Sequence, residues 1–332
     1  MAVQDFASLA EVEGWSEPSA KGLPGRVAAG VGRFARRKPL GAFCGFVVLF
    51  FMVVGDVVPE SLNKAAALAG LGSPVPYVAD QLEGAAAFVY PYSRQDLKAR
   101  LEGSSSEHIL GTDQLGRDVF SRLLYGARTA VMVSFGAVLI SQTIGASVGI
   151  ASGYYSGWVD SVLYRIVDVF QALPGLVVLI TILGIFGTGL WQMILVLGVI
   201  GGPSQSRTLR GQAIYVMASP FIEAARVVGA SDRRIMLRYL LPNVFPLIIL
   251  NATVSLGFIV LLEATLSFLG YGLEPPYPSW GQMLSLEGRQ YMRTEPGLAI
   301  YPGLAIGLLV FSFNLFGDAL RDVLDPRLRG GV

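Results

Sequence analysis

Residues 243–269 read NVFPLIILNATVSLGFIVLLEATLSFL, and this stretch contains a single charged side chain, that of Glu263. About 20 predominantly apolar residues in a helix are enough to cross the hydrocarbon core of a bilayer. The stretch therefore predicts a transmembrane helix, with Glu263 close to one membrane surface. Comparable apolar runs predict five further spans, at residues 39–55, 129–153 and 297–317 and twice within 169–206, where the glycines of residues 186–189 separate two helices.

The composition of the whole chain agrees with a membrane protein. Of its 332 residues 53% are hydrophobic and 15% are charged, and the mean hydropathy is +0.56. The formal net charge of +1 gives no basic surface for nucleic acid, which needs clustered Lys and Arg. Cys44 is the only cysteine, so the chain can form neither an internal disulfide nor a cysteine cluster. The fold class that we expect is all-α, with about six transmembrane helices.

The distribution of Lys and Arg predicts that both termini are cytoplasmic. Most of the 25 basic residues fall in the segments that this orientation places inside, and cytoplasmic loops retain positive charge. We expect a cytoplasmic tail at 1–38, a first transmembrane helix at 39–58 and a long extracytoplasmic segment at 59–128. After it we expect a five-helix core at 129–318, which includes a cytoplasmic loop at 207–242, and then a cytoplasmic tail at 319–332.

Small residues and one proline mark the predicted spans. Gly145, Gly149 and Gly153 recur every fourth residue, which lets two helices approach closely in lipid. Pro174 interrupts the third span and predicts either a simple kink or an opened backbone that lines a pathway.

The loop between the fourth and fifth spans is basic and amphipathic. Its residues 219–242, SPFIEAARVVGASDRRIMLRYLLP, predict two short helices, with Gly229 ending the first and Pro242 stopping the second. In the first helix one face would hold Phe221, Ala224, Ala225 and Val228. Such a hairpin suits a groove on a partner protein, or it could lie on the inner leaflet.

A polar segment precedes the second span. Residues 108–128 read HILGTDQLGRDVFSRLLYGAR, in which Asp113, Arg117 and Asp118 could form a charged lattice that fixes the entry of the helix. The segment is either a structural anchor or a contact for a delivery protein.

Chemistry for catalysis is missing from the sequence. No Gly-x4-Gly-Lys-Ser/Thr loop occurs, so a P-loop for ATP is excluded. His108 is the single histidine, which disfavours a hydrolase triad and a histidine metal site. We expect this chain to be no enzyme and to bind neither a metal nor a cofactor.

Two motifs resemble a known family. The loop resembles the EAA loop of ABC-importer permeases, which docks on the nucleotide-binding subunits, although Tyr239 stands where the family usually has Ile. The residues that carry this likeness are Glu223, Ala224, Ala225, Gly229, Leu241 and Pro242. The outer segment looks like the signature of the C-type permease of dipeptide, oligopeptide and nickel importers. Its residues are Gly111, Thr112, Asp113, Gly116, Arg117 and Asp118.

The resemblance covers roughly residues 30–330 and implies a type I ABC-importer permease fold in a bacterial or archaeal inner membrane. It implies four kinds of partner: a homologous second permease forming a heterodimer, two ABC ATPase subunits that hold ATP and Mg, an extracytoplasmic substrate-binding protein, and the lipid bilayer. The expected function is ATP-driven import of di- or oligopeptides. The alternatives are a permease for nickel or another small solute, an ion-coupled secondary transporter, and a scaffold without transport activity.

Overall fold

The computed structural model describes residues 34–36, 38–51, 90 and 92–324, and every regular element in these residues is a helix. The first is an apolar helix at Pro39–Phe51. The remaining elements are η1 Leu97–Ala99, α3 Val119–Tyr155, α4 Gly157–Ala172, α5 Gly175–Phe186, α6 Leu190–Met217, α7 Pro220–Val227, α8 Asp232–Arg234, η2 Ile235–Leu240, α9 Leu241–Phe268, α10 Trp280–Met283, η3 Leu284–Gly288, α11 Arg289–Tyr291 and α12 Gly297–Leu324. The predicted all-α class is confirmed.

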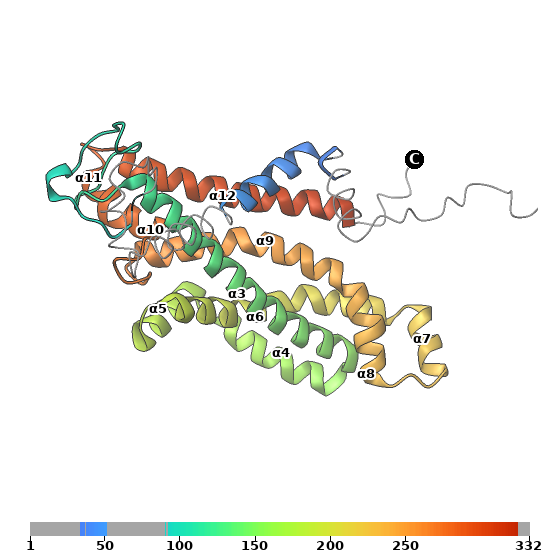
Figure 1. The fold of residues 1–332 in the computed structure, drawn as a ribbon. Helices are drawn as coiled ribbons and strands as arrows, with labels where there is room; N and C mark the ends of the chain where they lie inside the picture. The colour runs from blue at the N-terminus through green and yellow to red at the C-terminus, as the bar shows by residue number, and fades with distance from the viewer. Residues whose placement is uncertain (1–33, 37, 52–89, 91, 325–332) are drawn as a thin grey trace, which may run out of the picture.

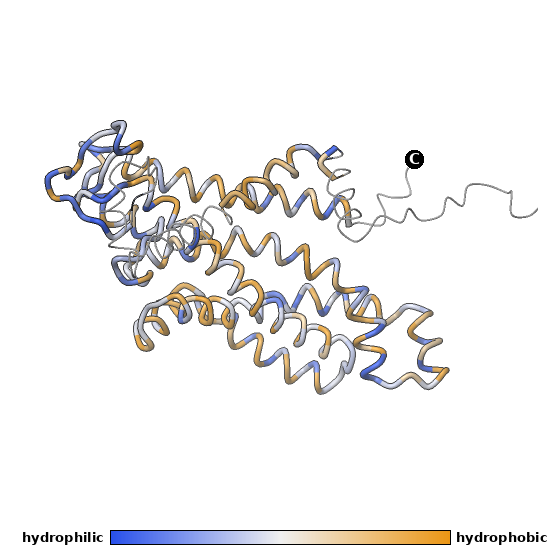
Figure 2. Tube along the Cα trace, viewed as in Figure 1, coloured by the Kyte–Doolittle hydropathy of each residue, from blue (hydrophilic) through white to orange (hydrophobic). Residues whose placement is uncertain are grey.

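The long helices lie side by side in an elongated bundle (Figure 1). At one end α7 and α8 form a hairpin, and at the other end lie α10, α11 and the chain that leads into α3. Hydrophobic residues dominate the middle of the bundle, and hydrophilic residues gather at the ends (Figure 2). This is the distribution that a bilayer requires.

Within the described residues three helices are long and apolar enough to span a membrane: α3, the continuous helix Asp232–Phe268, and Gly297–Val323 of α12. The pair α4 and α5 adds a fourth span if it is counted as one, and it is bent by 84° at the break beside Pro174. The other two expected spans correspond to Pro39–Phe51, which is short in its described part, and to α6, which contains Arg207 and Arg210. Length and composition alone thus give fewer spans than the six expected.

Several predicted boundaries can be compared with the helices. The turn between the third and fourth spans is where the glycines place it, because α5 ends at Phe186 and α6 begins at Leu190. The second span begins at Val119, ten residues before the predicted Thr129, because the side chain of Asp118 caps the helix and starts it earlier. Residues 1–33, 52–89 and 325–332 lie outside the described part, so the predicted tails and much of the segment 59–128 are not compared.

Close packing of α3 on α6 forms the centre of the bundle. A β-carbon at Gly149 would lie 2.7 Å from the carbonyl oxygen of Ser206, and one at Gly153 would lie 2.6 Å from the β-carbon of Ala213. The two backbones can approach this closely only because these α3 positions have no side chain. The predicted role of the glycines is confirmed.

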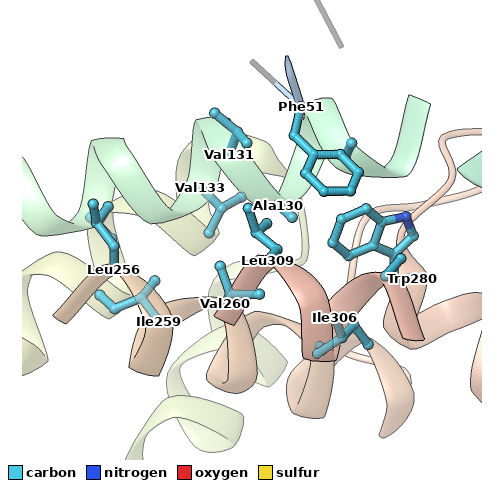
Figure 3. Packing of buried hydrophobic residues seen from close by; sticks show 14 of the residues in the cluster. Phe51, Ala130, Val131, Val133, Leu256, Ile259, Val260, Trp280, Ile306 and Leu309 are labelled. Carbon is cyan, nitrogen blue, oxygen red and sulfur yellow. The ribbon is translucent and has the colours of Figure 1, made fainter. Parts of the chain in front are cut away.

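A hydrophobic core joins α3, α9 and α12 with the first helix (Figure 3). Trp280 of α10 is 1% exposed and packs edge-on against Phe51, with ring centroids 5.6 Å apart. Its Nε1 donates a hydrogen bond of 2.8 Å to the carbonyl oxygen of Leu123 in α3. Trp280 thus fastens the connection between α9 and α12 to the start of α3.

Replacement of Gly149 by Ala should destabilise the protein by about 1–3 kcal/mol, since the new methyl group meets the backbone of α6. The matched control is Gly211→Ala in α6, where an added β-carbon meets no atom within 4 Å. That variant should be neutral or slightly more stable. Thermal unfolding in detergent tests this, and equal midpoints for the two variants would contradict the packing described.

Candidate functional site

The hairpin turns at Gly229, as predicted. Pro220 occupies the first turn of α7, and Gly229 follows the helix with a φ of +81°, in the left-handed region that favours glycine. The amide of Gly229 donates to the carbonyl oxygen of Arg226 at 2.9 Å, and that of Ala230 donates to Ala225 at 3.0 Å. These bonds satisfy carbonyl groups at the end of α7 and fix the turn.

Most of the apolar face predicted for α7 is exposed in this chain. Ile222 and Ala225 are buried, and Ile222 belongs to a cluster that also contains Ile235 and Leu240 of the second arm. Phe221 is exposed, and Val228 is 87% exposed. The reason is that α7 ends at Val227, so Val228 belongs to the turn and does not continue the helical face.

The tip of the hairpin is therefore apolar and open. Val227 and Val228 are 88% and 87% exposed, and they stand beside Arg226 in the sequence. The same loop carries four arginines within residues 226–238. The two exposed valines therefore form a small apolar patch within a basic surface.

Pro242 does not stop the second helix, which corrects the prediction. The chain is helical without a break from Asp232 to Phe268, and it widens into a π-helix at Ile235–Leu240 just before the proline. Pro242 lies at the start of α9, directly after this π-helix. A proline inside a helix lacks the N–H of one ladder hydrogen bond, and the π-turn before it accommodates that loss. Leu241 and Pro242 thus join the hairpin rigidly to a membrane span.

At the opposite end of the bundle, charged side chains form a buried cluster. The Arg117 Nε lies 2.6 Å from a carboxylate oxygen of Asp113, and another nitrogen of its guanidinium lies 2.8 Å from Glu287. Arg122 approaches the same two carboxylates at 3.4 and 3.5 Å. All four side chains are nearly buried, so this cluster ties the segment before α3 to the connection between α9 and α12.

Asp118 was predicted to join this lattice but serves another purpose. Its Oδ2 accepts hydrogen bonds of 2.7 Å from both the amide and the hydroxyl of Ser121, which caps α3. Its Oδ1 lies 2.9 Å from the Nδ1 of His108. The capping position of Asp118 at the helix N-terminus directs its carboxylate away from Arg117.

The remaining signature residues shape the backbone. Gly111 and Gly116 adopt φ values of +77° and +70°, which suit glycine. The hydroxyl of Thr112 accepts a hydrogen bond of 2.9 Å from the amide of Glu102 and donates one to the carbonyl oxygen of Ala99. All six signature residues therefore contribute to one compact cap over the start of α3.

The two candidate sites lie at opposite ends of the molecule (Figure 1). Sequence reasoning missed Arg122 and Glu287 as members of the charged cluster. Arg122 lies within the quoted segment, whereas Glu287 is 170 residues from Arg117 and has no motif that marks it. Burial raises the pKa of Glu287 to about 7, against the opposing effect of Arg122 and Arg117.

A bundle of apolar helices with a basic helical hairpin at one end defines a multi-pass membrane protein of the transport-subunit class. Residues 145–330 match the family described as the binding-protein-dependent transport system inner membrane component. The glutathione transport system permease protein GsiD of Pectobacterium atrosepticum is 40% identical over 247 residues, which are 74% of this chain and 82% of that protein. The dipeptide transport system permease protein DppC of Alkalihalophilus pseudofirmus is 38% identical over 238 residues, covering 72% and 78% of the two chains.

The chain belongs to the family of binding-protein-dependent transport system inner membrane components. Its fold is similar to that of a chain in an inward-facing structure of the MetNI methionine ABC transporter, with a TM-score of 0.52 and 21% identity over 61% of this chain and 96% of that chain. The predicted permease fold and inner-membrane localisation are confirmed.

Loss of the charged cluster should destabilise the end of the bundle that holds it. In Arg117→Gln the carboxylate of Asp113 loses its closest cation, and breaking such a buried pair costs on the order of 3–5 kcal/mol. Arg100→Gln is the matched control, because Arg100 is exposed. A thermal unfolding midpoint for Arg117→Gln as high as that of the control would contradict the assigned role.

The raised pKa of Glu287 predicts a pH dependence of stability. Because the folded pKa of about 7 exceeds the ordinary glutamate pKa of 4.5, the folded protein binds this proton more tightly. The resulting stabilisation is complete below about pH 4.5 and is lost as the pH rises through 7. Between pH 5 and 8 the unfolding midpoint should therefore fall more steeply in the parent protein than in Glu287→Gln. Glu107→Gln, at an exposed position, should keep the parental slope; equal slopes in all three would contradict the shift.

Proposed function

We propose that this chain is the permease subunit through which an ATP-driven importer carries peptides, and that its hairpin docks on the ATPase subunits. The observation that carries the docking role is the apolar tip of Val227 and Val228, presented by a turn that Gly229 fixes. A partner groove would cover these valines and meet the surrounding arginines with acidic groups. Glu223, Ala224 and Ala225 lie on α7 directly before this tip.

In this proposal the chain itself transmits force and binds no nucleotide. ATP and Mg are held by two ABC ATPase subunits, and a homologous second permease completes the translocation pathway. An extracytoplasmic binding protein delivers the substrate to the end that carries Gly111, Thr112, Asp113, Gly116, Arg117 and Asp118. The hairpin end and both termini are then cytoplasmic.

The continuous helix from Asp232 to Phe268 connects the hairpin to a membrane span without a flexible linker. Ile222 anchors α7 against the second arm, and the second arm continues through Leu241 and Pro242 into the bilayer. A displacement of α7 by closing ATPase subunits would therefore tilt a membrane span and could not be absorbed by a flexible linker.

The names of the relatives support a peptide as substrate. One relative is named as a glutathione permease and another as a dipeptide permease, and glutathione is itself a small peptide. Glu263, the charged residue within the α9 span, is 1% exposed and accepts a hydrogen bond of 2.8 Å from Ser267. In this proposal Glu263 is a structural side chain that Ser267 holds, and the energy for import comes from the ATPase subunits.

The docking role is tested by Gly229→Asp, with Gly270→Asp as the matched control. Both glycines have a positive φ, and an added β-carbon at either would meet no atom within 4 Å, but Gly270 follows α9 at the other end of the bundle. The strain of the left-handed conformation, about 1–2 kcal/mol, is then common to both variants. Gly229→Asp should reduce co-purification of the ATPase subunits at least tenfold, whereas Gly270→Asp should retain it. Equal recovery of ATPase with both variants would refute docking at the hairpin.

A further inference from the structure

At the inner end of α3 the side chain of Tyr154 contacts the hairpin. This residue lies in the last turn of α3 and is 9% exposed. Its ring belongs to the same apolar cluster as Ile222 of α7 and Ile235 of η2. Tyr154 is therefore packed against the hairpin, although it belongs to a different span.

Polar contacts from Tyr154 extend to both sides of the hairpin turn. Its phenolic hydroxyl donates a hydrogen bond of 2.6 Å to the Oδ1 of Asp232, the first residue of α8. The guanidinium of Arg226, in the last turn of α7, lies over its ring at 5.9 Å from the centroid, within the range of a cation–π interaction. Arg226 precedes Gly229 and Asp232 follows it, so one tyrosine holds the two arms of the turn.

The contact with Asp232 is strong by its chemistry. A hydroxyl that donates to a carboxylate makes a charge-assisted hydrogen bond, which is shorter and stronger than a neutral one. The two residues are 78 positions apart in the sequence. The bond is therefore a tertiary link between the hairpin and α3.

The helix that carries Tyr154 runs to the opposite end of the molecule. α3 is an uninterrupted helix of 37 residues, which is about 55 Å at 1.5 Å per residue. Near its other end Arg122 lies within the buried charged cluster with Asp113 and Glu287. A displacement imposed on Tyr154 would thus be carried by a rigid element to the cap over the start of α3.

We propose that Tyr154 is a positioning residue that transmits displacement of the hairpin to α3, and through α3 to the extracytoplasmic end. The inference rests on the proposed function, because it assumes that ATPase subunits move the hairpin. Tyr154 and α3 form a second route for this displacement, beside the direct connection of the hairpin to the α9 span. The hydroxyl of Tyr154 and the carboxylate of Asp232 are the groups on which this route depends.

The test is the number of ATP molecules hydrolysed per substrate molecule imported by the complete importer in proteoliposomes, with its binding protein and a dipeptide as probe. Tyr154→Phe removes only the hydroxyl and should raise this ratio at least about tenfold, the scale expected for losing a hydrogen bond to a charged group. The matched control is Tyr155→Phe, because the neighbouring Tyr155 is 50% exposed and packs on Tyr154 without a hydrogen bond recorded for its hydroxyl. This control should keep the parental ratio.

Two further variants separate transmission from general stability. Asp232→Ala should raise the ratio as Tyr154→Phe does, and the double variant should be no worse than either single one, since both remove the same bond. Asp232→Asn keeps an acceptor oxygen and should restore part of the coupling. Co-purified ATPase and the thermal unfolding midpoint should change little in Tyr154→Phe.

The outcomes distinguish this inference from the proposed function. If Tyr154→Phe keeps the parental ratio while Gly229→Asp loses its ATPase, the hairpin docks but Tyr154 does not transmit, and the inference is wrong. Additive effects of Tyr154→Phe and Asp232→Ala would also overturn it. If the parent chain recovers no ATPase subunits and imports the dipeptide without ATP, the proposed function itself fails.

Discussion

The contact between α3 and α6 is the constraint on which the arrangement of this protein depends. Lipid offers no hydrophobic driving force for helices to associate, so they associate by close packing. Gly149 and Gly153 allow the α6 backbone to approach α3 so closely that a single methyl group would collide with it. Once these helices are fixed, α9 packs on both, and α12 and Trp280 complete the core around them. The hairpin and the charged cap are thereby held at fixed positions at the two ends.

Polar and charged side chains hold each end of α3 in place. At one end Asp118 caps the helix while Arg117 and Arg122 share the carboxylates of Asp113 and Glu287. At the other end Tyr154 binds Asp232 of the hairpin. Arg210 of α6, which would be costly within an apolar helix, is neutralised by two bonds of 2.7 and 2.5 Å to Asp160 of α4. Arg117, Arg122 and Arg210 are thus each paired with a carboxylate.

The sequence predicts the parts of this protein that depend on local chemistry. The apolar runs, the turn at Gly229 and the glycine face of α3 follow from residue type and spacing alone, and the structure confirms them. The pairing of Arg117 with Glu287 could not be predicted, because it depends on how distant segments meet. The passage of a helix through Pro242 was predicted wrongly, since a π-turn before the proline accommodates it in a way that local rules do not anticipate. For the same reason the 84° bend between α4 and α5 could not be distinguished from a simple kink at Pro174.

The central claim is that ATPase subunits cover the apolar tip of the hairpin, and site-specific photo-crosslinking in native membranes tests it most directly. A photoreactive amino acid would replace Val228 at the tip in one variant and Ile109, which is exposed at the opposite end, in another. The account predicts an adduct with an ATPase subunit from position 228 and none from position 109. Absence of an ATPase adduct from position 228, with the crosslinker shown to be reactive there, would contradict it.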